Sequence, residues 1–287
     1  MPHNGAIICD AADNGWLTMT EIHRVHLTKN KLAAMPEAER SLLLLLGHAS
    51  NEINVLSKLI LMMRKDEPAI KLIDHVEAGQ VFIIMRVLIG KLHEAWRLFQ
   101  TRFQANRLLA KKYEPKLPPE AAAALTEVNR HFGKGSPLTK IRSAVSFHYT
   151  DDDNLAEASF QRLPETEPWE FYLSRTVGNS FYFASELVIG GSVIGLAMAQ
   201  PHGGAAPTDL SYDARAFADL CDTVTTVSGH ITELFGQIIA LIVVTSIGED
   251  VATTIVEIPD GPKMSTFCLP YFFDENDSFP PPALEPQ

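Results

Sequence analysis

An arginine and a histidine with complementary chemistry lie close together in the segment KIRSAVSFHYTDDD, residues 140–153. Arg142 is separated by five residues from His148, and Tyr149 follows directly. A guanidinium binds a phosphate group through two parallel N–H donors and keeps its charge at any working pH. An imidazole exchanges a proton near neutral pH. Together these side chains have the chemistry needed to hold a phosphate group and to move a proton beside it.

A short helix over about 137–149 is expected to position this pair. Ser136 is a good N-cap, and Pro137 fits the first helical turn. On a continuous helix Arg142 and His148 would lie roughly 120° apart, so their side-chain tips meet only if the helix ends first. Three consecutive aspartates soon after the histidine favour such an ending. In the alternative interpretation, Arg142 pairs with a carboxylate and His148 caps the C-terminus of the helix.

Three further helices are expected before this one. The first runs from Pro36 to about residue 63 and carries apolar residues at three- and four-residue steps. These residues are Leu42, Leu45, Leu46, Ala49, Ile53, Leu56, Ile60 and Met63. The second helix is expected over about 69–112, and the third starts at Pro119 and runs to about residue 131. Four helices with short connections predict an all-α, antiparallel four-helix bundle over residues 36–150.

The segment IRSAVSFHY, on the fourth expected helix, resembles the R-x4–6-H signature of HEPN domains, the higher eukaryote and prokaryote nucleotide-binding superfamily. The resemblance covers roughly residues 37–150. Members are small all-α bundles, and many are metal-independent endoribonucleases of defence and toxin–antitoxin systems. In those enzymes the arginine and histidine of two protomers meet across a dimer interface, and RNA is cut by attack of its 2′-hydroxyl.

The resemblance implies a role for each residue of the motif. Arg142 would stabilise the phosphorane, and His148 would be the general acid or base. Ser143 occupies the position where such enzymes commonly carry asparagine or another polar amide or acid. Tyr149 is adjacent to the histidine, whereas the toxin subgroup has a tyrosine two residues beyond it. The bundle is therefore either an active nuclease or a non-catalytic domain of the same shape.

The segment LLGHASNEINVLSKL, residues 45–59, supplies a second polar group. Helical geometry places Glu52 close to the apolar face, with His48 one turn before it. A buried carboxylate needs a partner, because an unpaired buried charge is strongly unfavourable. We expect Arg142 to be that partner, and the alternative is a glutamate at the rim that reaches water. The supporting residues of the candidate pair are therefore Glu52, His48, Ser143 and Tyr149.

A polar stripe is expected along the second helix. At 100° per residue its members fall within roughly 40° of one another. They are Arg86, His93, Arg97, Gln104 and Lys111. The two arginines, the histidine and the lysine are candidate nucleic-acid-binding residues, because such a stripe can follow a phosphate backbone. The alternative is the solvated face of a long helix.

Composition limits the class of protein. Among 287 residues, 46% are hydrophobic and 21% are charged, which is ordinary for a globular chain and excludes wholesale disorder. The three cysteines are widely spaced and odd in number, which argues against a disulfide framework or a cysteine zinc site and suits a reducing cytoplasm. The first residues lack the pattern of a secretion signal, and no membrane-spanning segment is predicted. We therefore expect a cytoplasmic protein.

The charges are unevenly distributed along the chain. Residues 1–149 hold 20 of the 24 lysines and arginines and 14 acidic residues, a balance of +6. Residues 150–287 hold the other 4 basic residues and 21 acidic residues, a balance of −17. Either two solvated surfaces of opposite sign attract each other within the fold, or the first half faces a polyanion and the second half shields that contact.

The chain is expected to fall into four parts. An N-terminal extension, residues 1–35, precedes the bundle of residues 36–150. Residues 151–275 form an acidic and mostly helical second part, and a proline-rich tail follows over 276–287.

Three features are expected within the acidic second part. A long helix covers residues 211–247 with an interruption at Gly229, and a β-hairpin covers residues 252–273 around a Pro-Asp-Gly turn. The apolar segment 184–198 is interpreted as helix rather than buried strand. It contains Glu186, which is expected to meet a base of the first half.

Three functional hypotheses follow from these patterns. The leading one is an RNA-directed HEPN-like module, a metal-independent endoribonuclease of the defence or toxin type that acts as a homodimer without a cofactor. The second is a non-catalytic helical interaction or assembly protein that binds basic protein partners through residues 150–287. The third and weakest is a metal-dependent bundle enzyme, since the E-x-x-H pairs that di-iron bundles need do not occur on the expected bundle helices.

Overall fold

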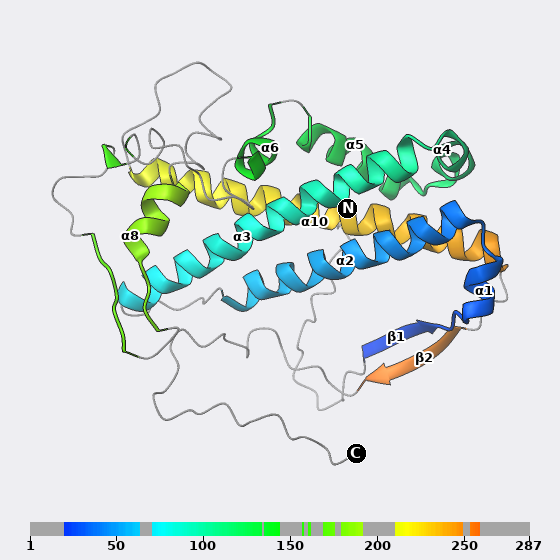
Figure 1. Cartoon of the computed structure of the whole chain (residues 1–287), viewed down its shortest axis with the longest axis horizontal. Coiled ribbons are helices and arrows are strands. Elements are labelled where there is room, and N and C mark those ends of the chain that lie inside the picture. Colours follow the sequence, from blue (N-terminus) through cyan, green and yellow to red (C-terminus); the bar gives the residue numbers. More distant parts are fainter. Residues whose placement is uncertain are drawn as a thin grey trace, which may run out of the picture.

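The computed structural model describes residues 20–63, 71–133, 135–143, 157, 160–161, 169–175, 179–191, 210–248 and 253–258. Three long helices run side by side in this part of the chain (Figure 1): α2 (Glu37–Met63), α3 (Lys71–Phe99) and α10 (Leu210–Ile247). Helix α2 is antiparallel to the other two. A fourth helix, α5 (Pro119–His131), packs along α10.

Shorter elements connect and flank these helices. They are β1 (Thr20–Val25), α1 (Lys29–Ala34), the π-helix η1 (Gln100–Gln104), α4 (Arg107–Tyr113), the 3₁₀-helix η2 (Glu114–Lys116), α6 (Pro137–Ile141), α8 (Phe183–Ser185), the π-helix η4 (Glu186–Gly191) and β2 (Thr253–Ile258). The expected fold class, all-α with a small antiparallel sheet, is confirmed.

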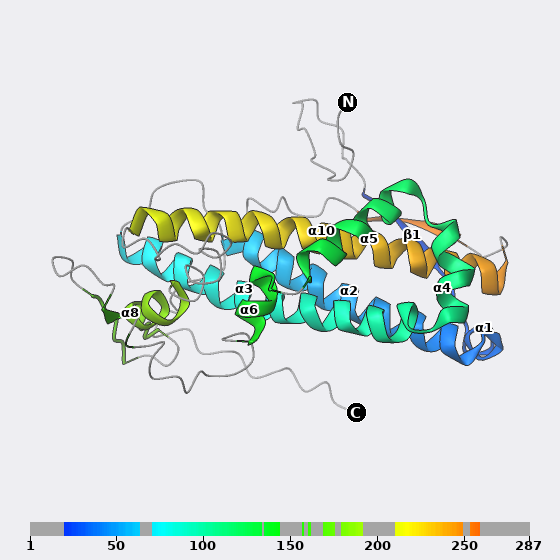
Figure 2. The ribbon, with the colours of Figure 1, turned by 90° about the horizontal axis from the view of Figure 1, so that it is seen from above.

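One hydrophobic core joins both halves of the chain. It contains residues of α2, α3, α5 and α6 together with residues of α10. Three aromatic rings illustrate the joint: Phe99 stacks on Phe103 at 4.8 Å between ring centroids and on Phe235 of α10 at 5.6 Å. The core therefore does not divide at residue 150. The third long helix of the bundle is thus α10, from the second half of the chain, whereas α6 is short, as expected, and lies against α3 (Figure 2).

By length and composition alone, one helical stretch among the described residues is apolar enough to cross a membrane, namely Ala216–Ser246 of α10. The central helix of a soluble protein passes the same test. The inner side of α10 belongs to the shared hydrophobic core, which accounts for much of its apolar composition.

The helix boundaries follow local signals. Helix α2 begins after Pro36 and ends at Met63 as expected, with its apolar stripe on the core side. Helix α5 begins at Pro119 as expected. Ser136 caps α6, because its Oγ accepts a hydrogen bond from the backbone N–H of Thr139 at 3.2 Å.

The expected continuous helix over 69–112 is wrong. Helix α3 ends at Phe99, a π-helical turn follows, and α4 starts after Asn106. The side chain of Asn106 accepts hydrogen bonds from the N–H groups of Leu108 and Leu109 at 3.2 and 3.4 Å, so it acts as the N-cap of a new helix. The expected interruption of the long helix at Gly229 is also wrong, since α10 is unbroken there.

The two strands come from opposite ends of the chain. Strands β1 and β2 pair antiparallel, with Ile22 opposite Val256. The N-terminal extension thus supplies the observed partner of β2. The downstream strand expected within 252–273 lies outside the described residues.

Two glycines let the segment 179–191 lie close to α3. A Cβ atom at Gly79 would clash with the ring of Phe181, and one at Gly190 would clash with the ring of Phe82. The expected helical conformation of segment 184–198 is confirmed as far as Gly191.

A buried carboxylate, Glu39, ties three helices together at one end of the bundle. Lys112 Nζ of α4 donates to Glu39 Oε1 at 2.6 Å, and Ser246 Oγ of α10 donates to Oε2 at 2.7 Å. Burial acts to raise the pKa of Glu39, but the hydrogen bonds from Lys112 and Ser246 outweigh it and leave the pKa below its ordinary value. The hydrogen bond to Glu39 likewise raises the pKa of Lys112.

Glu39→Ala is expected to lower the free energy of unfolding by about 3 kcal/mol, because Lys112 and Ser246 lose the carboxylate that accepts their hydrogen bonds. The folded-state pKa of Glu39 is lowered, so its contribution is full above the ordinary glutamate pKa and is lost as the pH falls through the lowered value. Denaturant unfolding at neutral and acidic pH measures both effects. The exposed Glu37 on the same helix provides the control Glu37→Ala. A loss of equal size in both variants would contradict this role of Glu39.

Candidate functional site

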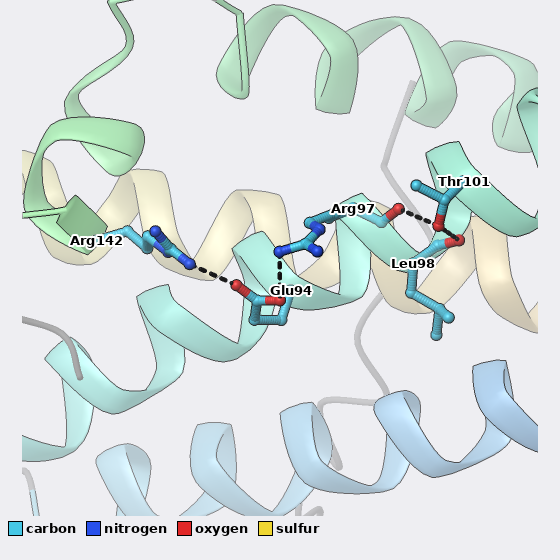
Figure 3. A network of polar contacts seen from close by, with 5 residues as sticks. All are labelled: Glu94, Arg97, Leu98, Thr101 and Arg142. Carbon is cyan, nitrogen blue, oxygen red and sulfur yellow. Dashed lines mark hydrogen bonds and ion pairs between the residues drawn. The ribbon is translucent and has the colours of Figure 1, made fainter.

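Arg142 is held against α3 by an ion pair with Glu94. It is the C-cap residue of α6, and its Nη2 donates to Glu94 Oε1 at 2.8 Å (Figure 3). One turn along α3, Arg97 Nη1 lies 3.8 Å from the other carboxylate oxygen. The side chains of Arg142 and Glu94 are 31% and 40% exposed, so the pair is in contact with solvent. We call Arg142, Glu94, Arg97 and His93 the Glu94 cluster.

Backbone and side-chain contacts fix this part of α3. Thr101 Oγ1 donates to the carbonyl oxygens of Arg97 and Leu98 at 2.9 and 3.2 Å (Figure 3). These bonds reinforce the last turn of the helix, where the π-helix begins. The hydrogen bonds at the last turn of α3 thereby fix the position of Arg97.

His93 lies half-buried beside the ion pair. Its ring meets the ring of Phe132 edge-on at 5.8 Å, and Trp96 stacks on the same phenylalanine at 6.1 Å. Burial lowers the pKa of His93, and the positive charges of Arg142 and Arg97 lower it further, against the opposing effect of Glu94. The imidazole is therefore neutral at physiological pH.

The Glu94 cluster has more hydrogen-bond donors than acceptors. Two guanidinium groups share one carboxylate, which leaves a net charge of +1 beside a neutral imidazole. Arg142 Nε and His93 Nδ1 are buried and have no hydrogen-bond partner in the described part of the chain. A guanidinium carries five N–H donors, so each arginine can contact an anion while it keeps Glu94. The arrangement suits a bound phosphate group.

The predicted pairing of Glu52 with Arg142 is wrong. Glu52 Oε1 accepts from Lys91 Nζ of α3 at 2.6 Å, and His48 lies 3.9 Å from the same oxygen with a largely exposed side chain. The glutamate thus joins α2 to α3 at the bundle surface. Lys91 is the base that pairs with Glu52. The sequence pattern does not distinguish Lys91 from Arg142 as the partner of this carboxylate.

The remaining motif residues lie partly outside the described chain. Ser143 is exposed, and its Oγ donates to the carbonyl oxygen of Thr139 at 2.9 Å. His148 and Tyr149 lie outside the described residues. The structure therefore shows how Arg142 is positioned and brings it together with His93 and Arg97, two residues of the predicted stripe.

The rest of the predicted stripe is divided. Arg86 donates from Nη2 to Glu186 Oε2 at 2.9 Å and lies 5.0 Å above the ring of Phe82. This confirms the expectation that Glu186 meets a base of the first half. Burial raises the pKa of Glu186, and the charge of Arg86 opposes that rise. Lys111 is exposed on α4 and is separated from Arg97 by the helix break.

Sequence reasoning missed a second polar cluster. Tyr172 donates to Glu170 Oε2 at 2.5 Å, and its hydroxyl lies 2.7 Å from His75 Nδ1 of α3. The His75 ring stacks on Phe183 at 4.0 Å. Loss of hydration and the hydrogen bond to Glu170 raise the pKa of Tyr172 to about 12, which keeps the phenol protonated. The Glu-x-Tyr spacing, which puts both side chains on one side of an extended segment, was the available signal.

No group of three or more histidine, cysteine, aspartate or glutamate side chains in the described residues is arranged to hold a metal ion. The Glu94 cluster is rich in cations, and cations are poor ligands for a metal. Its chemistry is that of an anion site.

No family model matches the chain, and neither the curated proteins nor the solved structures that were searched contain a match.

Arg142→Gln is expected to raise the pKa of His93, because a positive charge that opposes protonation of the imidazole is removed. Glu94→Gln is expected to lower the pKa, because a carboxylate that favours the imidazolium is removed. NMR titration of the His93 ring, assigned with His93→Gln, measures both shifts. Arg130→Gln, on an exposed part of α5, is the control and should leave the titration unchanged. Shifts in the same direction in both cluster variants would contradict the arrangement.

Proposed function

We propose that the protein is an RNA-directed HEPN-like module and a metal-independent endoribonuclease of the defence or toxin type. The observation that supports this most is the solvent-accessible contact of Arg142 with Glu94, beside Arg97 and the neutral imidazole of His93. An arginine oriented by a carboxylate and left with free donors is what phosphate recognition needs. The motif histidine, His148, follows six residues later in the sequence.

In this proposal Arg142 binds the scissile phosphate and stabilises the charge that develops on the phosphorane. His148 is the general acid or base. The 2′-oxygen loses its proton and attacks phosphorus, and the 5′-oxygen leaves and gains a proton. The products are a 2′,3′-cyclic phosphate and a 5′-hydroxyl. Because every step is a proton transfer or a displacement at phosphorus, no metal or other cofactor is required.

Glu94 has a positioning role in this scheme. Its ion pair with Arg142 selects one direction for a long side chain, so less conformational freedom is lost when phosphate binds. Arg97 adds a second positive charge at the same place and extends the surface along α3. In the proposed homodimer, the same residues of two protomers face one RNA strand in the cytoplasm.

The first test is incubation of the purified full chain with total cellular RNA in excess EDTA. Cleavage is expected, with cyclic phosphate ends on the products. His148→Ala is expected to reduce the rate at least a hundredfold, as removal of a general acid or base does. Arg142→Lys should also fail to cleave RNA, because a lysine keeps the positive charge but lacks the planar pair of N–H donors.

Two control variants separate catalysis from folding. His26→Ala removes an exposed histidine between β1 and α1, and Arg130→Ala removes an exposed arginine of α5. Both are expected to cleave RNA at the wild-type rate. Circular dichroism checks that all variants fold. Cleavage that survives His148→Ala, or that needs a divalent metal, would contradict the proposal.

A second candidate function is a non-catalytic interaction or assembly protein. It is favoured by the same ion pair, because Arg142–Glu94 also joins α6 to α3 as a structural contact. In that case RNA stays intact in all variants, and Arg142→Ala lowers stability without any other effect. The RNA assay and an unfolding curve of Arg142→Ala thus distinguish the two functions.

A further inference from the structure

A cleft of about 790 Å³ lies between α2, α3 and α10. None of the residues of the Glu94 cluster lines it, so it is separate from the proposed phosphate site. Part of its lining is apolar and comes from all three helices. The apolar residues include Ile60, Val81, Met85, Leu88 and Phe217.

The charged residues that line this cleft are all acidic among the described residues. They are Asp74 and Glu77 of α3, and Asp222 and Glu233 of α10. Glu233 accepts a hydrogen bond from the amide of Gln237 at 3.0 Å, which is a neutral donor and leaves the charge of the carboxylate intact. The two carboxylates of α10, Asp222 and Glu233, therefore make a cation the complementary ligand for that wall of the cleft.

The two carboxylates of α10 are spaced along the cleft. Asp222 and Glu233 are eleven residues apart, which puts them on the same side of the helix within about 20° and roughly 16 Å apart along its axis. The cleft is thus long, with a negative charge towards each end of its α10 wall. An elongated ligand with a cationic group at each end fits this spacing.

A buried hydroxyl lies between these two charges. Ser228 lines the cleft, is 6% exposed, and its Oγ has no hydrogen-bond partner. Ser57 of α2 also lines the cleft, and its buried Oγ has no partner either. Buried hydroxyl groups normally have a partner. Neither oxygen has appreciable accessible surface in the unbound chain, so a ligand that brings N–H donors to the middle of the cleft supplies these hydrogen bonds once the serine side chains rotate towards it.

We propose that the cleft binds a linear aliphatic polyamine. The terminal nitrogens of fully extended spermine lie roughly 16 Å apart from standard tetrahedral bond geometry. They match the separation of Asp222 and Glu233, the inner nitrogens face the serine hydroxyls, and the methylene groups contact the apolar lining.

Isothermal titration calorimetry of the full chain with spermine tests the proposal. Saturable binding of one spermine per chain is expected. Asp222→Asn with Glu233→Gln is expected to weaken it by about tenfold, the effect of losing two ion pairs with exposed carboxylates. The charge-matched control is Asp219→Asn with Glu120→Gln, two exposed acids that do not line the cleft. If this control weakens binding equally, spermine is held only by the overall negative charge and the proposal fails.

A steric variant tests the cleft independently of charge. Gly229 lines the cleft, and a Cβ atom there would meet no other atom within 4 Å. Gly229→Leu should therefore fold, as circular dichroism would show, and should abolish spermine binding by filling the cleft. Gly236 is in equally open space on the same helix but does not line the cleft, so Gly236→Leu is the matched control. Unchanged binding by a folded Gly229→Leu variant would overturn the proposal.

The length of the ligand gives a third comparison. Putrescine spans only about 6 Å between its nitrogens and cannot reach both carboxylates of α10, so its binding should be at least tenfold weaker than that of spermine. 1,12-Diaminododecane keeps the full span and an apolar middle and should still bind, but more weakly than spermine because it lacks the inner N–H donors for the serine hydroxyls. If the full chain binds a basic amphipathic peptide but no spermine, the cleft is a peptide site and the proposal is overturned.

Discussion

Six side chains described on α10 are completely buried where this helix meets the rest of the bundle: Val227, Ile231, Leu234, Phe235, Ile238 and Ile242. Each contributes about 2 kcal/mol when it is removed from water. The net stability of a whole domain is only about 5–15 kcal/mol. Because α2, α3 and α5 share one core with α10, the first half of the chain has no complete core of its own. The position of α3, and with it the position of Glu94, therefore depends on a helix that lies more than a hundred residues later in the sequence.

Helix α3 then separates two regions of opposite charge. Its C-terminal part carries His93, Glu94 and Arg97, where Arg142 adds a second guanidinium and the net charge is positive. Its N-terminal part carries Asp74 and Glu77 beside the acidic side of α10. The uneven charge of the two halves of the sequence thus corresponds, in part, to two distinct surfaces on one bundle. The basic Glu94 cluster and the acidic residues of the cleft can coexist on one bundle because they lie on different parts of α3.

The sequence predicted the fold well where a signal depends only on neighbouring residues. Pro36, Pro119 and Ser136 marked helix starts correctly, and the apolar stripe of α2 faces the core. Asn106 was a cap signal inside an otherwise helical pattern, so the break between α3 and α4 was readable but was outweighed by the periodicity. The partner of β2 and the place of α10 in the bundle depend on contacts between distant segments, which periodicity does not contain.

The sequence predicted which residues belong to the candidate site better than it predicted the contacts that these residues make. Arg142, His93 and Arg97 are brought together, but by Glu94, which the sequence did not single out. Glu52 was expected to meet Arg142 and instead meets Lys91, because the choice among several bases is decided by the rotation and register of packed helices. The Tyr172 cluster depends on an extended segment that crosses the end of α3, and its residues share no helical period.

In the function we propose, Arg142 and His148 form one phosphate-binding surface for RNA. The most direct measurement is NMR titration with a short oligoribonucleotide whose 2′-hydroxyls are methylated, so that it binds without being cut. Saturable shifts of the Arg142 Nε–H and His148 ring signals are expected, with the signals of Arg86 unchanged. The absence of shifts at Arg142 and His148, or equal shifts at every exposed arginine, would contradict it.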